Sequence, residues 1–88
     1  MSVKIKLNLP LQKLAGNREA MVVNGATVGQ CLEDLINRLP GAKQHIFYQD
    51  GSLAVLFLLN NEPLPRQALE HPVKEGDELW ILSLIAGG

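Results

Sequence analysis

The stretch Thr27–Gly41, TVGQCLEDLINRLPG, decides the fold that this sequence predicts. Its apolar residues recur at intervals of three and four, which places them on one side of an α-helix. Thr27 suits the position before the first turn, and Gln30 three residues later completes a capping box. Pro40 and Gly41 are expected to end the helix. The apolar stripe consists of Val28, Cys31, Leu32, Leu35, Ile36 and Leu39.

Two strand patterns precede this helix. Residues 3–9, VKIKLNL, alternate strictly between apolar and polar side chains, which predicts a half-buried strand that ends at Pro10. Residues 19–23, EAMVV, predict a second strand, and Gly16-Asn17 supplies a turn between the two. We therefore expect an opening hairpin with a short polar connection. The buried face of its first strand would carry Val3, Ile5, Leu7 and Leu9.

Two more strand patterns follow the helix, after a segment at residues 41–52 that is expected to be a loop. Residues 53–60, LAVLFLLN, and residues 79–84, LWILSL, are apolar, short and flanked by turn signals, which favours strands over helices. The segment between them is irregular. The order strand, strand, helix, strand, irregular segment, strand predicts an α+β domain. One mixed sheet of four to five strands would pack on one main helix, in a single domain over residues 1–88.

One helix can cover only one face of this sheet, yet the last two strands are apolar on both faces. If one set of alternating residues faces the helix, the other set faces outward. Large apolar patches on small proteins are usually interaction sites, so a partner surface is expected there. The alternative is that the irregular segment or the loop covers it. Lys4 and Lys6 are either solvated charges or the rim of this surface. The inward set is Val55, Phe57, Leu59, Leu79 and Ile81; the outward set, here called the outer-face cluster, is Leu56, Leu58, Trp80 and Leu82.

Composition excludes several classes of function. The net charge is −1 and no run of Lys or Arg occurs, which argues against binding to nucleic acid or to an anionic membrane. No apolar stretch approaches the roughly 18 residues that span a bilayer. The first residues have a strand pattern and no export signal. One cysteine cannot form an internal disulfide, so a reducing cytoplasm is the expected location.

Side chains offer little chemistry. Cys31 lies on the apolar stripe, which predicts a buried and inert thiol. His45 and His71 have no partner at metal-ligand spacing, so no metal site is expected. No phosphate-binding motif occurs, and no bound cofactor is expected. The chain is therefore not expected to be catalytic alone.

The last four residues, Ile85–Gly88 or IAGG, are the remaining candidate and are here called the tail. Gly87 and Gly88 have no Cβ, so they can pass through a narrow slot. From Leu84 onward an extended chain reaches about 16 Å. The terminal carboxylate is ionised at neutral pH and is a nucleophile toward a phosphate. An enzyme that supplies ATP would form an acyl-adenylate, from which sulfur would give a thiocarboxylate and an amine would give an amide.

Three segments support a family resemblance. They are Thr27–Gln30, TVGQ, at the helix start; Asn60–Leu64, NNEPL, after the third main strand; and Lys74–Leu79, KEGDEL, which runs into ILSLIAGG. Their order and spacing resemble the ThiS/MoaD family of ubiquitin-like sulfur carriers over essentially the whole chain. The family usually has Gly where Asn61 stands and often has Pro near Ser83.

This resemblance implies a β-grasp fold with the hairpin and the last strand in the middle of the sheet. It also implies that an E1-like enzyme adenylates Gly88 with ATP and Mg²⁺, and that a persulfide donor supplies sulfur. Gly87 would belong with Gly88 to the catalytic end of the chain, and Ile85, Ala86 and the outer-face cluster would contact these partners. The AGG end and the length most resemble the small subunit of molybdopterin synthase, whose large subunit would receive the tail. The alternatives are a carrier for thiamine or cysteine-type biosynthesis, or a ubiquitin-like protein modifier.

Overall fold

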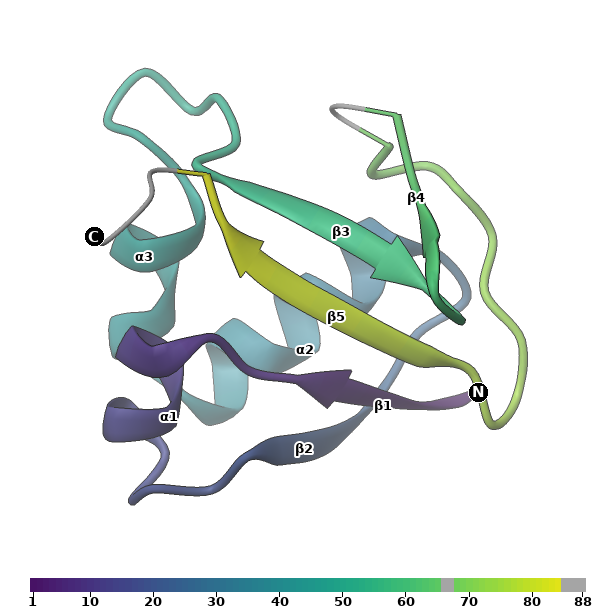
Figure 1. The fold of residues 1–88 in the computed structure, drawn as a ribbon, viewed down its shortest axis with the longest axis horizontal. Coiled ribbons are helices and arrows are strands. Elements are labelled where there is room, and N and C mark those ends of the chain that lie inside the picture. The colour runs from purple at the N-terminus through teal and green to yellow at the C-terminus, as the bar shows by residue number, and fades with distance from the viewer. Residues whose placement is uncertain (66–67, 85–88) are drawn as a thin grey trace.

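The computed structural model describes residues 1–65 and 68–84 (Figure 1). This part of the chain forms a five-stranded sheet with one main helix across one face, as the sequence predicts. The strand order is β2-β1-β5-β3-β4. β1 and β5 are parallel, whereas the other neighbouring pairs are antiparallel. The strands are β1 (Ser2–Lys6), β2 (Ala20–Asn24), β3 (Val55–Leu59), β4 (Glu62–Pro63) and β5 (Glu78–Ser83).

The strand order corrects one expectation. The opening hairpin does form, and β5 lies in the middle of the sheet with β1 beside it. However, β2 is an edge strand, so only the first strand of the hairpin is central. β5 is the last strand in sequence and lies between β1 and β3; β1 pairs with its first half, up to Trp80, and β3 pairs with it up to Ser83.

The main helix, α2 (Val28–Arg38), begins as its sequence predicts. The Thr27 side chain accepts a hydrogen bond from the Gln30 backbone N–H at 3.1 Å. Gln30 in turn accepts at Oε1 from the Ala26 N–H at 2.8 Å, one residue before the expected partner. These two bonds satisfy N–H groups at a helix start that have no partner within the helix.

The irregular segment packs against the start of α2. The Gly29 N–H donates to the Leu69 carbonyl at 2.7 Å, and the Val28 N–H donates to the His71 carbonyl at 3.0 Å. A Cβ on Gly29 would lie 3.0 Å from the same Leu69 carbonyl, which explains why glycine occupies this position. Through these backbone hydrogen bonds, residues 69–73 pack at the start of α2 and not on the outer face of the sheet.

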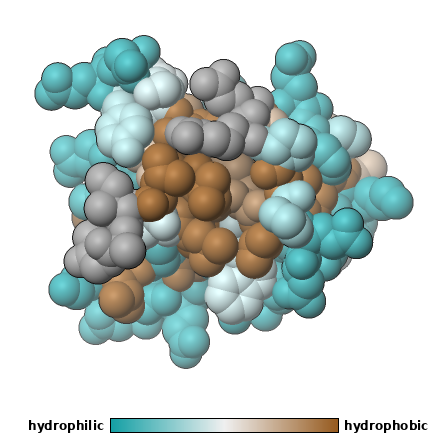
Figure 2. Space-filling model, turned by 45° about the horizontal axis from the view of Figure 1, so that its top comes forward, coloured by the Kyte–Doolittle hydropathy of each residue, from teal (hydrophilic) through white to brown (hydrophobic). Residues whose placement is uncertain are grey.

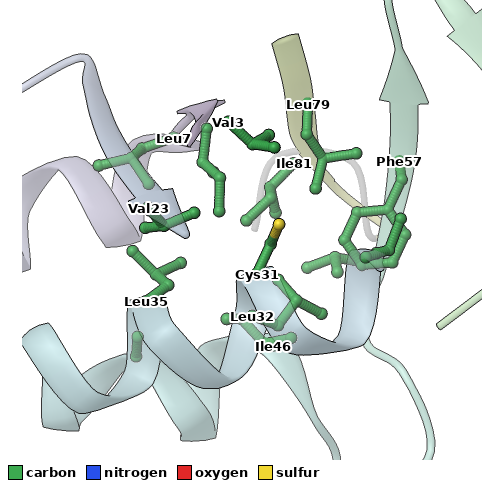
Figure 3. Packing of buried hydrophobic residues seen from close by; sticks show 14 of the residues in the cluster. Val3, Leu7, Val23, Cys31, Leu32, Leu35, Ile46, Phe57, Leu79 and Ile81 are labelled. Carbon is green, nitrogen blue, oxygen red and sulfur yellow. The ribbon is translucent and has the colours of Figure 1, made fainter. Parts of the chain in front are cut away.

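The core lies between α2 and the inner face of the sheet (Figure 3). Leu32 and Leu35 project from α2 against strand residues such as Ile81, and none of these side chains exposes more than 1% of its surface. The inward set predicted from the alternation is confirmed. Four of its members are buried in this core, and the fifth, Leu59, packs against it. The largest fully buried side chains are Ile5, Leu11, Leu32, Leu35, Ile46, Leu79 and Ile81.

Two segments expected to be irregular are helical. α1 (Leu9–Leu14) occupies the connection between β1 and β2. Asn8 caps it, and Pro10 lies in its first turn, where a proline suits a helix. Leu9 is therefore 69% exposed and does not share the buried face of β1, which was wrongly expected. Beyond α2, a 3₁₀ turn, η1 (Pro40–Ala42), leads into α3 (Lys43–Ile46), where a loop was expected.

A hydrogen-bonded turn network supports the entry to β5. Asn60 and Asn61 form the tight β3–β4 turn, both with positive φ, which asparagine tolerates better than most residues. The Asp77 carboxylate accepts from the Asn60 side-chain N–H at 3.0 Å and from the Lys74 backbone N–H at 2.7 Å. These bonds, the Asn60 bond first, hold the pKa of Asp77 below its ordinary value.

Replacement of Asp77 tests this network. A lowered pKa in the folded state stabilises the protein above the unfolded-state pKa of about 3.9, and this stabilisation is lost as the pH falls through the folded-state pKa. Asp77→Asn keeps only one of the two acceptor oxygens, so we expect its free energy of unfolding to be about 1 kcal/mol lower than that of the wild type at pH 7. The free energies of unfolding of the two proteins, measured with urea, should differ less at pH 3 than at pH 7. Equal stability at pH 7 would show that the network contributes nothing.

Candidate functional site

The candidate site has two parts, the outer face of the sheet and the tail that follows β5. Four of the residues expected to act, Ile85, Ala86, Gly87 and Gly88, lie outside the described residues. The structure therefore bears on this part of the site only through the residues that lead to it, β5 and Leu84. β5 pairs with β3 up to its last residue, through the register Val55 with Ser83.

The outer-face cluster is continuous across β3 and β5. Leu58 is paired with Trp80, and Leu56 is paired with Leu82, so all four side chains share the face opposite α2. Figure 2 shows hydrophobic residues gathered on one face of the molecule. The structure thus brings together the four residues that the alternation predicted.

This cluster is less open than the sequence suggests. Each of its four side chains is half-buried and none packs against the main core. Val22, on the edge strand β2, is by contrast 59% exposed. The side chains of the cluster shield one another, because cross-strand pairs on one face lie about 5 Å apart. The result is a compact apolar surface of moderate exposure.

Trp80 is fixed within the cluster by two polar neighbours. Its indole Nε1–H donates to Glu78 Oε1 at 2.8 Å. Lys6 Nζ lies 5.1 Å from the centre of the Trp80 ring, within the range of a cation–π interaction. A tryptophan held in one orientation loses little side-chain entropy when a partner covers it.

Lys6 and Glu78 show how much of the site the sequence reveals. The alternation of β1 places Lys4 and Lys6 on the outward face and marks them as a possible rim. The register between β1 and β5 places Lys6 beside Trp80. Glu78 was missed, because its role depends on the rotamer of Trp80. A carboxylate two residues before an outward tryptophan on the same strand is the only sequence signal.

Cys31 is not part of the site. It projects from α2 toward the strands and its surface is fully buried (Figure 3). Burial raises the pKa of its thiol, which disfavours the reactive thiolate. The predicted core position of this side chain is confirmed.

Replacement of Cys31 tests whether its side chain serves only in core packing or also takes part in the reaction. Cys31→Ala should lower stability by about 1–2 kcal/mol through the small cavity it leaves. Transfer activity should stay unchanged once folding is confirmed, because no step needs this thiol. Cys31→Ser, which buries a hydroxyl in an apolar site, should be the less stable of the two. Loss of activity in a folded Cys31→Ala protein would place a reacting group on α2.

The described residues offer no site for a metal ion, since no three of their histidine, cysteine, aspartate or glutamate side chains cluster. His45 is on α3, and His71 precedes the strand bridge at Pro72. Among the helices in residues 1–65 and 68–84, none is long and apolar enough to cross a membrane.

Comparison with known proteins agrees with this geometry. The small archaeal modifier protein 1 (SAMP1) of Haloferax volcanii is 36% identical over 87 residues, covering 94% of this chain and 97% of that protein. Its crystal structure superposes with a TM-score of 0.82 at full coverage of both chains. CysO of Amycolatopsis orientalis, solved in complex with BexX, is 29% identical, with a TM-score of 0.83 and 98% and 99% of the two chains covered.

A third likeness shows the fold alone. The putative molybdopterin converting factor subunit 1 of Pyrococcus furiosus is 21% identical, with a TM-score of 0.75 over 97% and 99% of the two chains. These matches confirm the predicted β-grasp fold. The ThiS family model matches residues 5–88. The chain therefore belongs to the ThiS family, whose members include ubiquitin-like sulfur carriers and modifiers.

Proposed function

We propose that this chain is a sulfur carrier whose C-terminal carboxylate, on Gly88, is the reacting group. The observation that carries the proposal is the family match, which extends to the terminal residue. The scaffold supports it in two ways. The single cysteine of the chain, Cys31, is buried in the core, so its thiol is poorly placed to compete as a reacting group. The central strand β5 leads directly to the tail.

The chemistry proceeds by activation and displacement. A carboxylate oxygen of Gly88 attacks the α-phosphorus of ATP on an E1-like enzyme, and pyrophosphate leaves. The resulting acyl-adenylate is an electrophile, which the free carboxylate is not. A persulfide sulfur then attacks the acyl carbon and AMP leaves, giving an acyl disulfide. A second thiol then attacks the donor's sulfur and forms a new disulfide with it, so that the sulfur–sulfur bond of the acyl disulfide breaks and the thiocarboxylate of Gly88 leaves. This chain contributes the carboxylate and the docking surface, and its partner contributes ATP and Mg²⁺.

The outer-face cluster is the proposed docking surface for these partners. Hot spots of interfaces are rich in tryptophan and lie in apolar surroundings. Trp80 meets this description, since it is paired with the cluster residue Leu58 and is fixed by Glu78 and Lys6. The relative CysO was solved in a complex with a second protein, which supports a partner-binding role for this fold.

The first acceptor to test is the large subunit of molybdopterin synthase, with sulfur passing to a pterin precursor. The AGG end and the length of the chain support this branch. The likeness to CysO makes a carrier for cysteine-type biosynthesis the second acceptor, and a thiamine-pathway acceptor is the third.

A second candidate function is protein modification through an amide bond from Gly88 to lysine. It is favoured by the 36% identity to a relative named as a modifier protein. Both functions use the same adenylate and differ only in the nucleophile that displaces AMP.

Co-expression with the E1-like enzyme of the same genome distinguishes these functions. A carrier should gain the mass difference between one sulfur and one oxygen. A modifier should instead appear in a ladder of larger species that resist reducing agent. If the chain forms neither product although its cognate activating enzyme is active, both functions fail.

A further inference from the structure

Ser83, the last residue of β5, is hydrogen-bonded to Asn8, the N-cap residue of α1 near the start of the sequence. The Asn8 side chain donates from Nδ2 to Ser83 Oγ at 3.1 Å. The pairing of β1 with β5 stops at Lys6 and Trp80. This bond therefore extends the connection between the two strands beyond their last paired residues, up to the residue just before Leu84.

The same Asn8 side chain holds α1 in place. Its Oδ1 accepts from the Leu11 N–H at 3.3 Å, as an N-cap does. The amide thus uses its oxygen for the helix and its nitrogen for Ser83. A cap needs only the oxygen, since serine, threonine and aspartate cap helices as well. The amide nitrogen is therefore available for a different task.

From this geometry we infer that Asn8 and Ser83 are positioning residues, which fix the point and direction from which the tail leaves the sheet. The inference rests on the proposed function. On one side Ser83 is held by its pairing with Val55, and on the other by Asn8. Without the second contact, Ser83 and Leu84 would be less ordered. A partner that captures the tail would then have to order these two residues as well, and each ordered residue costs backbone entropy.

The bond itself contributes little to stability, because it is exposed and joins two neutral side chains. Its loss should therefore affect capture of the tail and not folding. Once the tail is in the active site of the activating enzyme, its carboxylate occupies the same position in both proteins. We expect KM to rise and kcat to stay unchanged.

Two variants break the bond from opposite ends. Ser83→Ala removes the acceptor and leaves the cap intact. Asn8→Ser keeps a good N-cap but is too short to reach Ser83. Each should raise the KM for adenylation about three- to tenfold with kcat within about twofold. The double variant should be no worse than either single one, since both remove one interaction.

Matched controls distinguish loss of the Asn8–Ser83 hydrogen bond from unrelated effects of a substitution. Ser83→Thr keeps the hydroxyl and should restore the wild-type KM. Ser2→Ala, at a strand serine whose side chain forms no hydrogen bond within the described residues, should change nothing. In ¹⁵N relaxation of the free protein, the order parameters of residues 83 and 84 should fall in Ser83→Ala from about 0.85 toward 0.6. This readout needs no partner.

The outcomes separate the inference from the function on which it rests. Unchanged KM and unchanged order parameters in Ser83→Ala would overturn the positioning role and leave the carrier function standing. An increase in KM that Ser83→Thr does not reverse would also overturn it. If the wild-type chain is not adenylated at all, the proposed function fails, and this inference fails with it.

Discussion

Deletion of Gly88 is expected to abolish adenylation and sulfur transfer while the fold stays intact. The deletion moves the terminal carboxylate back by about 3.3 Å. Misplacement of a reacting atom by about 1 Å can cost about 100-fold in rate, so we expect a loss of at least 100-fold. Pyrophosphate release with the purified activating enzyme measures the first step. Thermal unfolding and Trp80 fluorescence should match the wild type, because β5 ends at Ser83.

Gly88→Ala is the matched control for this deletion. It keeps the length of the tail and its carboxylate and adds only one Cβ. Activity between that of the wild type and that of the deletion would indicate a narrow slot in the activating enzyme, since glycine passes where a side chain collides. Full turnover by the deletion variant would contradict the assignment of Gly88 as the reacting residue.

Trp80→Glu is expected to weaken binding to the activating enzyme or to the acceptor subunit by about 30-fold or more. That factor corresponds to a hot-spot loss of about 2 kcal/mol. The substitution places a charge among apolar cluster residues and removes the ring that Lys6 contacts. Calorimetric titration measures the affinity. Stability should fall by only about 1 kcal/mol, because Trp80 is half-buried and outside the main core.

Val22→Glu provides the charge-matched control on the same sheet. Val22 is 59% exposed on the edge strand β2, which is separated from β5 by β1. Its replacement should leave partner affinity nearly unchanged. If Trp80→Glu binds as tightly as the wild type, the outer-face cluster is not the docking surface. If that variant unfolds, the tryptophan is a structural residue.

The parts of this fold that depend on local patterns could be predicted from the sequence. The capping residue Thr27 and the apolar stripe of α2 gave the main helix within one residue of its observed end. The side-chain period of two sorted the residues of β3 and β5 into two sets, and the hypothesis that Leu58 and Trp80 belong to the outward set is confirmed by their pairing.

The parts that depend on competing local signals were missed. Leu9 continues the alternation of β1, so it was expected in the strand, yet Asn8 and Pro10 are also signals for a helix start. The helix signal prevails because Asn8 satisfies a backbone N–H of α1 and also reaches Ser83. Periodicity alone cannot weigh these alternatives.

Contacts between distant parts of the chain could not be read from single residues. The parallel pairing of β1 with β5 joins strands more than 70 residues apart, and no local pattern specifies it. Two observations about the site follow only from this pairing: Lys6 lies over Trp80, and Asn8 reaches Ser83. The sequence therefore identified which residues face outward, but not which of them hold one another in place.

The most direct test of the central claim is to locate the sulfur atom on the activated chain. The protein is isolated after reaction with the activating enzyme, ATP and a persulfide donor, and its fragments are analysed by mass spectrometry. We expect exchange of one oxygen for one sulfur in the C-terminal fragment that contains Gly88, with Cys31 unmodified. A sulfur atom added to Cys31 while the C-terminal carboxylate stays unchanged would contradict the assignment of Gly88 as the reacting residue.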